Sequence, residues 1–446
     1  MKSKNLTNGS IMGNIVSFSL PYLLSYFLQT LYGLADLFVV GQYCGVSCIT
    51  AVSIGSQVMH MITVIVVGLA MGTTVTTAQS VGANDVARTK RVVGNTVTLF
   101  MVFSLLMAAG LVGWVGDIVS LMSTPVEAAT ETTSYLTICF IGIPFIVAYN
   151  IIASIYRGMG DSKSPMYFIA IACVVNVLLD YLLIGYLDMG AAGAAWATTL
   201  SQTVSVLVAL IVMNRGDSGV RISRSDLKPQ RAVMGKILNI GVPVALQDGF
   251  VQVGFIIITI IANQRGLNDA AAVGIVEKII GILFLIPSSM LSTVSTVSAQ
   301  NLGAGKLDRA IRTLWYANCI VIGFGTFFSI IMQMFPEKAV GLFTDDPQVI
   351  VQGCQYLQGY VWDCVFAGIH FCFSGFFCAC GWSIISFIHN AVSIVVARVP
   401  LAYLASIMYP TTLFPMGLAT VTGSVVSVII CVGVFVWMKK HRKFVV

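Results

Sequence analysis

Twelve long apolar stretches dominate this chain and limit what it can fold into. Each has about 20 residues or more, enough to cross a hydrocarbon core of about 30 Å as a helix. Gly-punctuated runs of this length lack the alternation of barrel strands, so helices are expected. The sequence therefore predicts an all-α integral membrane protein. The twelve predicted spans are roughly 12–41, 49–77, 92–115, 133–157, 165–185, 191–213, 236–264, 270–299, 310–333, 351–379, 384–408 and 414–437.

The composition supports this class. Of the 446 residues, 57% are hydrophobic and only 9% are charged, and the mean hydropathy is +0.91. A soluble domain carries about 25% charged residues.

The basic residues are distributed unevenly along the chain. Alternate connections and both chain ends hold most of the 24 Lys and Arg residues, whereas the opposite connections hold only Arg265 and Lys338. This bias predicts cytoplasmic termini in a multi-pass protein of the inner (plasma) membrane. It explains the net charge of +6 without a nucleic-acid partner. The expected partner is the lipid bilayer.

The chain repeats itself at an offset of 221 residues. The matched residues follow spans two and eight and end span four and its counterpart: Ala78, Gln79, Gly82, Ala83, Arg88, Arg91 and Gly160 recur as Ala299, Gln300, Gly303, Ala304, Arg309, Arg312 and Gly381. Six spans per copy place both copies in the same orientation. The prediction is two six-helix bundles related by a pseudo-twofold axis along the membrane normal. The expected parts are an N-lobe at 1–213, a cytoplasmic linker at 214–235 and a C-lobe at 236–446, and one chain is expected to function as a monomer.

Several motifs resemble those of multidrug and toxic compound extrusion (MATE) transporters. They are GANDVARTKR and GAGKLDRAIR after spans two and eight, RGMGDSKSPM after span four, NVLLDYLLIG in span five and ADLFVVGQ ending span one. The resemblance covers essentially all twelve spans. It implies an antiporter, not an enzyme, that expels amphiphilic, mostly cationic compounds in exchange for H⁺ or Na⁺ by alternating access. It implies no cofactor.

Asp36 and Asp180 are the strongest candidates for a site, because a carboxylate inside an apolar span marks function. At 1.5 Å per residue, both lie about 7–8 Å below the outer ends of their spans. Asn176 shares a helix face with Asp180, and Thr198 enters at a similar depth. The resemblance implies that these four residues bind the coupling cation. Two nearby carboxylates cannot both ionise cheaply in a low-dielectric site, and their oxygens suit H⁺ or Na⁺. The alternative is that Asp36 and Asp180 only make polar contacts between helices.

The second half carries different charges. At an offset of 222, Asp36 corresponds to Ile258 and Asn176 to Arg398, so one cation site per chain is expected. Asp248, Glu277 and Asp363 lie within C-lobe spans, as do Lys278 and Arg398. The three acids either attract cationic substrates or are locked in ion pairs, since buried charges are usually paired.

Asn150 is a weaker substrate-site candidate. It lies near the inner end of span four, where a packing role is favoured over substrate contact.

Two other functions were weighed. A lipid-linked oligosaccharide flippase of the same wider fold is the alternative, but it favours a cationic cavity, and the charges within the spans are mostly acidic. An enzyme would require a metal set or a nucleophile–base pair at matched depth, and the sequence offers neither. No phosphate-cradling Gly-Lys-Ser/Thr loop is present, which argues against direct use of ATP.

Overall fold

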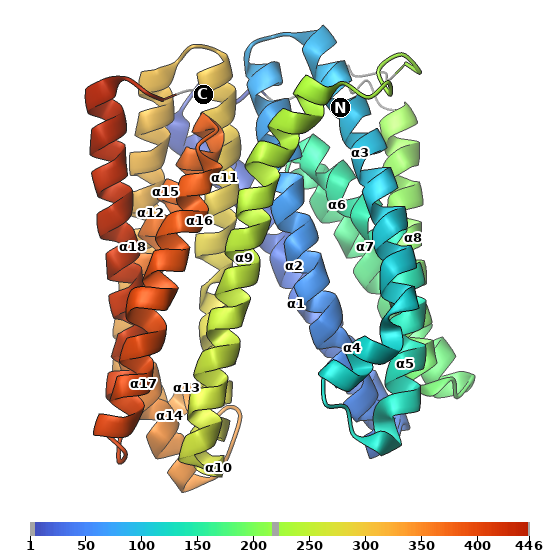
Figure 1. The fold of residues 1–446 in the computed structure, drawn as a ribbon, viewed down its shortest axis with the longest axis vertical. Coiled ribbons are helices and arrows are strands. Elements are labelled where there is room, and N and C mark those ends of the chain that lie inside the picture. Colours follow the sequence, from blue (N-terminus) through green and yellow to red (C-terminus); the bar gives the residue numbers. More distant parts are fainter. Residues whose placement is uncertain (1–4, 216–222, 445–446) are drawn as a thin grey trace. The chain divides into compact units, whose positions relative to one another are not determined.

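The computed structural model describes residues 5–215 and 223–444, and all regular secondary structure in these ranges is helical (Figure 1). The first half contains α1 (Ile11–Tyr43), α2 (Val46–Gly82), α3 (Val86–Gly113), α4 (Val115–Leu121), α5 (Val126–Ile141), α6 (Ile143–Gly158), α7 (Lys163–Asp180), the π-helix η1 (Tyr181–Tyr186) and α8 (Gly190–Arg215). The second half contains α9 (Arg231–Arg265), α10 (Leu267–Leu283), α11 (Leu285–Gly303), α12 (Leu307–Met334), α13 (Pro336–Val340), α14 (Pro347–Tyr360), α15 (Asp363–Cys380), α16 (Ser383–Val392), the π-helix η2 (Ser393–Arg398), α17 (Val399–Met408) and α18 (Phe414–His441).

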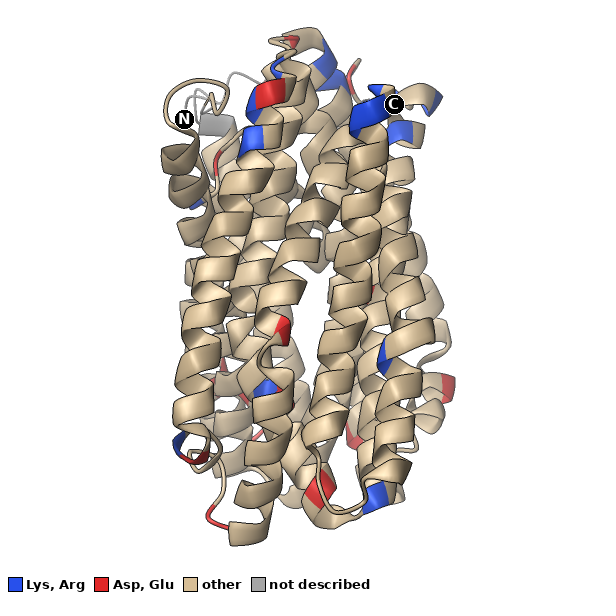
Figure 2. Cartoon of the chain, turned by 90° about the vertical axis from the view of Figure 1, so that its left-hand side faces the viewer, with Lys and Arg blue, Asp and Glu red and all other residues tan. Residues whose placement is uncertain are grey.

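Among the described helices, eleven are long and apolar enough to cross a membrane. The number rises to twelve when α5 and α6, which meet at a bend of 46°, count as one broken span. The prediction of an all-α membrane protein is confirmed. Figure 2 shows why the spans are easily recognised: Lys, Arg, Asp and Glu lie mostly at the helix ends, and few occur along the middle of the helices.

Short polar side chains define where several helices begin. Asp85 precedes α3 and accepts a hydrogen bond from the backbone N–H of Arg88 at 2.8 Å. Asp161 accepts from the N–H groups of Lys163 and Ser164 at the start of α7. Such caps satisfy donors that have no partner within the helix.

The chain forms two compact units whose boundaries lie inside helices. Unit 1 comprises residues 1–5 and 17–241, and unit 2 comprises residues 6–16 and 242–446. The first turns of α1 thus belong to unit 2, and the first turns of α9 belong to unit 1. Each of these helices carries a proline just after the boundary, Pro21 in α1 and Pro243 in α9, where the helix loses a backbone hydrogen bond.

The beginnings of α1 and α9 are anchored in the same manner. In unit 2, the N–H of Leu6 donates to Gln300 Oε1 at 3.0 Å, and Lys306 Nζ donates to Thr7 O at 2.9 Å. Arg309 Nη2 donates to Gly9 O at 2.7 Å. In unit 1, the segment before α9 docks on α3: the N–H of Gln230 donates to Asn95 Oδ1 at 2.6 Å, and Thr98 donates to Leu227 O at 2.8 Å.

The turns that the sequence repeat matches also share a backbone geometry. Gly160 and Gly381 both have a φ of 85°, and Asn84 and Gly305 have φ values of 55° and 71°. These are left-handed conformations, which glycine and asparagine adopt more readily than other residues. The repeat of residue types is therefore a repeat of structure.

Candidate functional site

Unit 1 brings together the four residues that the sequence nominates for cation binding. Asp36 comes from α1, Asn176 and Asp180 from α7, and Thr198 from α8. The Thr198 hydroxyl donates to Asp36 Oδ2 at 3.3 Å. The Asp36 carboxyl also lies close enough to Asp180 and Asn176 for their side chains to interact. We call these four residues the acid nest.

The acid nest is buried and short of hydrogen-bond donors. Asp36 is 7% exposed and Asp180 is 0% exposed. Among the described residues, neither Asp180 oxygen nor Asp36 Oδ1 has a hydrogen-bond donor, and neither carboxyl pairs with a Lys or Arg. Two ionised carboxylates are both acceptors, so their approach does not satisfy either of them. A proton or a small cation between the two carboxyls would supply the donor or the positive charge that the protein itself does not provide.

The backbone changes character at this point of α7. Asp180 is the last α-helical residue, and the π-helix η1 follows immediately. A π-turn widens the helix by one residue and often occurs at functional sites. In this protein the π-turn begins directly after Asp180, whose carboxyl belongs to the acid nest.

Two further polar residues adjoin the acid nest and were missed in the sequence. Tyr32 lies one turn before Asp36 on α1, interacts with it electrostatically, and contacts Gln202. Gln202 lies one turn after Thr198 on α8, and its Oε1 atom is buried without a donor. The signal that could have identified them is the i, i+4 spacing to Asp36 and Thr198, which places each on the same helix face.

Asn150 hydrogen-bonds within its own helix. Its side chain is buried on α6, and Nδ2 donates to the backbone carbonyl of Ile146 at 2.8 Å. The amide nitrogen of Asn150 therefore bonds within its own helix, which agrees with the packing role favoured by the sequence.

In unit 2, Asp363 and Arg398 form an ion pair. Arg398 Nη2 lies 3.3 Å from Asp363 Oδ2 and donates to the Tyr360 hydroxyl at 2.9 Å. The guanidinium also lies 5.0 Å from the centre of the Phe255 ring. The sequence left two roles open for Asp363, attraction of a cationic substrate or an ion pair, and the structure shows the ion pair.

The other two acids of unit 2 have no such partner among the described residues. Glu277 interacts with Arg398 and Thr259, but its Oε1 atom is buried without a donor. Asp248 accepts a hydrogen bond from Gln247 at 3.4 Å. Lys278, a possible partner in the sequence, is exposed.

Unit 2 also contains a buried histidine pair that the sequence did not indicate. The rings of His370 and His389 lie 5.5 Å apart between centroids, and both side chains are buried. His389 hydrogen-bonds Ser374 at 2.8 Å and Ser427 at 3.2 Å. The burial of His389 depends on packing between helices, which no local sequence pattern reports.

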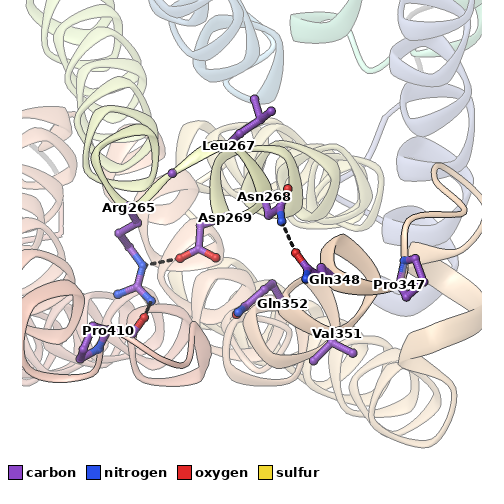
Figure 3. A pocket seen from close by; sticks show the side chains of 10 residues that line it. Arg265, Leu267, Asn268, Asp269, Pro347, Gln348, Val351, Gln352 and Pro410 are labelled. Carbon is purple, nitrogen blue, oxygen red and sulfur yellow. Dashed lines mark hydrogen bonds and ion pairs between the residues drawn. The ribbon is translucent and has the colours of Figure 1, made fainter.

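A hollow of unit 2 is lined mainly by the end of α9 at Arg265 and by the first turns of α10 and α14 (Figure 3). Arg265 forms an ion pair with Asp269 at 2.7 Å and donates to four backbone carbonyls, those of Ser406, Tyr409, Pro410 and Thr412. Its donors are fully used in tying the α9–α10 turn to the end of α17. The hollow is therefore a structural clamp.

The described residues contain no group of three or more His, Cys, Asp or Glu side chains that could hold a metal ion. All eleven cysteines are free. The acid nest, with two carboxyls, an amide and a hydroxyl, suits a proton or a hard monovalent cation and not a transition metal.

Comparison with known proteins identifies the family. The MatE family model matches two segments of the chain, residues 21–182 and 243–404. The chain is 28% identical over 407 residues to the probable multidrug resistance protein YpnP of Bacillus subtilis (strain 168), covering 91% of each chain. It is 26% identical over 444 residues to YoeA, another probable multidrug resistance protein of that strain, covering 97% of this chain and 95% of the relative.

A solved structure supports the fold. A crystal structure of MATE in complex with MaL6 matches 98% of this chain and 97% of its own, with a TM-score of 0.90 and 23% sequence identity. The two family-model segments start at Pro21 and Pro243, so both copies of the repeat match separately. The chain is a membrane transporter rather than an enzyme, and it belongs to the MatE family of multidrug and toxic compound extrusion transporters.

Proposed function

We propose that the chain is a secondary active multidrug efflux antiporter, which exports amphiphilic, mostly cationic compounds in exchange for H⁺ or Na⁺ by alternating access. The observation that carries this proposal is the acid nest. It holds two buried carboxyls in mutual contact, and no basic residue in the described part of the chain pairs with either. Such a site suits the reversible binding of one small cation.

The coupling follows from charge. An empty acid nest holds buried negative charge, which is unfavourable in a low-dielectric bundle. Binding of H⁺ or Na⁺ removes that penalty and favours the state of unit 1 that encloses the cation. A cation that binds one state more tightly shifts the equilibrium toward it, and the membrane potential adds about 2.3 kcal/mol per charge per 100 mV.

We further propose that Asp248 and Glu277 attract the cationic part of the substrate, and that Asp363 contributes through its pair with Arg398. Of the three acids that the sequence places within the C-lobe spans, Asp248 and Glu277 have no ion-pair partner among the described residues. The flippase alternative gains no support here, because the two arginines with largely buried side chains in the described part of unit 2, Arg265 and Arg398, are each paired with a carboxylate.

The test is efflux of ethidium from proteoliposomes with the pH and Na⁺ gradients imposed separately. One gradient is expected to drive efflux by the unchanged protein. Asp36→Asn and Asp180→Asn are each expected to abolish gradient-driven efflux, because an amide cannot gain and lose a cation as a carboxyl does.

Asp117→Asn is the matched control, since Asp117 is an exposed acid on α4 outside the acid nest. It should export at the unchanged rate. Efflux that responds to neither gradient, or that survives in both nest variants, contradicts the proposal.

A further inference from the structure

Arg157 is a buried cation of unit 1 that the acid nest does not use. It is the penultimate residue of α6 and is only 9% exposed. The sequence places it in a basic connection, but the structure turns its guanidinium into the bundle. There it lies 5.0 Å from the centre of the Tyr22 ring, and Nη2 donates to Ser154 Oγ at 3.0 Å.

No carboxylate neutralises this charge among the described residues. Neither of the two ion pairs within them involves Arg157. The nearest acid along the chain, Asp161, already accepts hydrogen bonds from the N–H groups of Lys163 and Ser164 and from the Ser164 hydroxyl. A hydroxyl and a π-face stabilise a guanidinium but leave its net charge in place, and buried charges are normally paired.

The surroundings of Arg157 are aromatic. Tyr149 lies two turns earlier on α6 and is close to both Arg157 and Tyr22. Tyr22 stacks edge-on with Tyr26, one turn later on α1, at 5.0 Å between ring centroids. A guanidinium presents a planar fork for a carboxylate or phosphate, and tyrosine rings present flat apolar faces.

The cluster is specific to unit 1. At the repeat offset of 221, the counterpart of Arg157 is Cys378, whose thiol is buried beside Ser386. The duplication therefore did not require an arginine at this position for packing.

We propose that Arg157, with Tyr22 and Tyr149, forms an anion subsite that binds the carboxylate or phosphate group of an aromatic or acyl amphiphile. The inference rests on the proposed multidrug function and deepens it by naming the residues that bind the anionic group of a zwitterionic substrate, a compound that carries one anionic group beside its cation. A lipid phosphate presents the same chemistry, and the test separates the two sources.

The test uses two dyes that differ in one group. Rhodamine 19 carries a free carboxylate, and rhodamine 6G is its ethyl ester. Binding to the purified full-length protein in phosphatidylcholine nanodiscs is followed by fluorescence anisotropy. Arg157→Gln should weaken rhodamine 19 binding by about tenfold or more and rhodamine 6G binding by less than about twofold, as expected for the loss of one hydrogen bond to a charged group.

Two further variants keep the test valid if Arg157→Gln does not fold. Arg157→Lys retains the charge without the planar fork and should show a smaller loss, confined to rhodamine 19. Tyr22→Leu removes the ring under the guanidinium and should weaken both dyes. Repeating the measurements in dodecyl maltoside, a detergent without phosphate, identifies the source: tighter binding of rhodamine 19 alone than in phosphatidylcholine assigns the subsite to a lipid phosphate, and unchanged binding assigns it to the substrate.

Equal losses of the two dyes in Arg157→Gln, or no loss of either, would overturn the anion subsite. This result is distinct from failure of the proposed function, which would appear as absence of gradient-driven rhodamine 6G efflux by the unchanged protein.

Discussion

Arg398 and Asn176 occupy the same place in the two copies of the repeat, at an offset of 222 residues. In unit 1, the amide of Asn176 adjoins two carboxyls that have no cationic partner within residues 5–215 and 223–444. In unit 2, the guanidinium of Arg398 pairs with Asp363. The same position of the repeat therefore holds a neutral amide beside two acids in unit 1 and the cation of an ion pair in unit 2.

The ion pair between Asp363 and Arg398 in unit 2 leads to a prediction about stability. Asp363→Asn should lower the free energy of unfolding by about 3–5 kcal/mol, because it leaves Arg398 buried without a counter-charge. The measurement is thermal unfolding of the purified protein. The double variant Asp363→Asn with Arg398→Gln should recover much of the loss, since it removes both charges.

The same variants decide between the two roles of Asp363. A loss of stability in Asp363→Asn that lowers efflux of all drugs alike assigns the residue to structure. Unchanged stability with an altered order of drug preference would instead assign it to substrate binding.

A second prediction for a single residue concerns Gly72. A Cβ on Gly72 of α2 would overlap the backbone carbonyl of Ile237 at the start of α9. Gly72→Leu should therefore destabilise the protein by several kcal/mol or prevent its accumulation, because backbone on both sides leaves no room to adjust. Gly110→Leu is the control, since nothing lies within 4 Å of its Cβ position, and it should accumulate normally. Measurement is by fluorescence-detected size exclusion.

At the level of elements, α1 and α9 are the helices that each begin in one unit and continue in the other. Their first turns are held by polar contacts, and each contains a proline shortly afterwards. A helix fixed at its start and weakened by a proline has a defined place to bend. The acid nest lies further along α1, so a change at Asp36 acts on a helix whose other end is anchored.

The anchor of α1 is testable by hydrogen–deuterium exchange. Lys306→Ala combined with Arg309→Ala removes the side chains that bind the carbonyls of residues 7–9. Amide exchange in residues 6–16 should then increase at least about tenfold, as expected for loss of roughly 1.4 kcal/mol of local stability. Arg312→Ala, an exposed position on the same helix, should leave exchange unchanged. Unchanged exchange in the double variant would show that apolar packing alone holds this segment.

At the scale of the whole molecule, the repeat and the distribution of charge predict how the chain is inserted. Two copies of six spans place both termini on one side, and the basic connections predict that this side is cytoplasmic. A C-terminal green fluorescent protein fusion should therefore fluoresce, and a C-terminal alkaline phosphatase fusion should be inactive. A phosphatase fusion at Asp345, in the connection that follows Lys338, should be active. The reverse pattern would contradict the predicted orientation.

The fold was largely predictable from the sequence, and the site was predictable in part. Span length and charge exclusion are local properties, so the apolar runs were found without knowledge of packing. The acid nest was nominated by depth along each helix. Tyr32 and Gln202 were missed because a tyrosine or glutamine in a span is unremarkable until its neighbours are known. The pairing of Asp363 with Arg398, rather than with Lys278, also depended on which helix faces meet.

The amino-acid sequence by itself determined that this protein spans a membrane as helices, that it is built from two copies, and that its first copy carries acids at matched depth. Those features follow from hydrocarbon thickness and from the free energy of placing charge in it, which act on each segment separately. Only the tertiary structure decided which charges are neutralised. Arg157 faces Tyr22 and pairs with no carboxylate of the described residues, whereas Arg398 reaches Asp363 and Asp36 meets Asp180. These contacts join different helices, so no single segment of the sequence reports them.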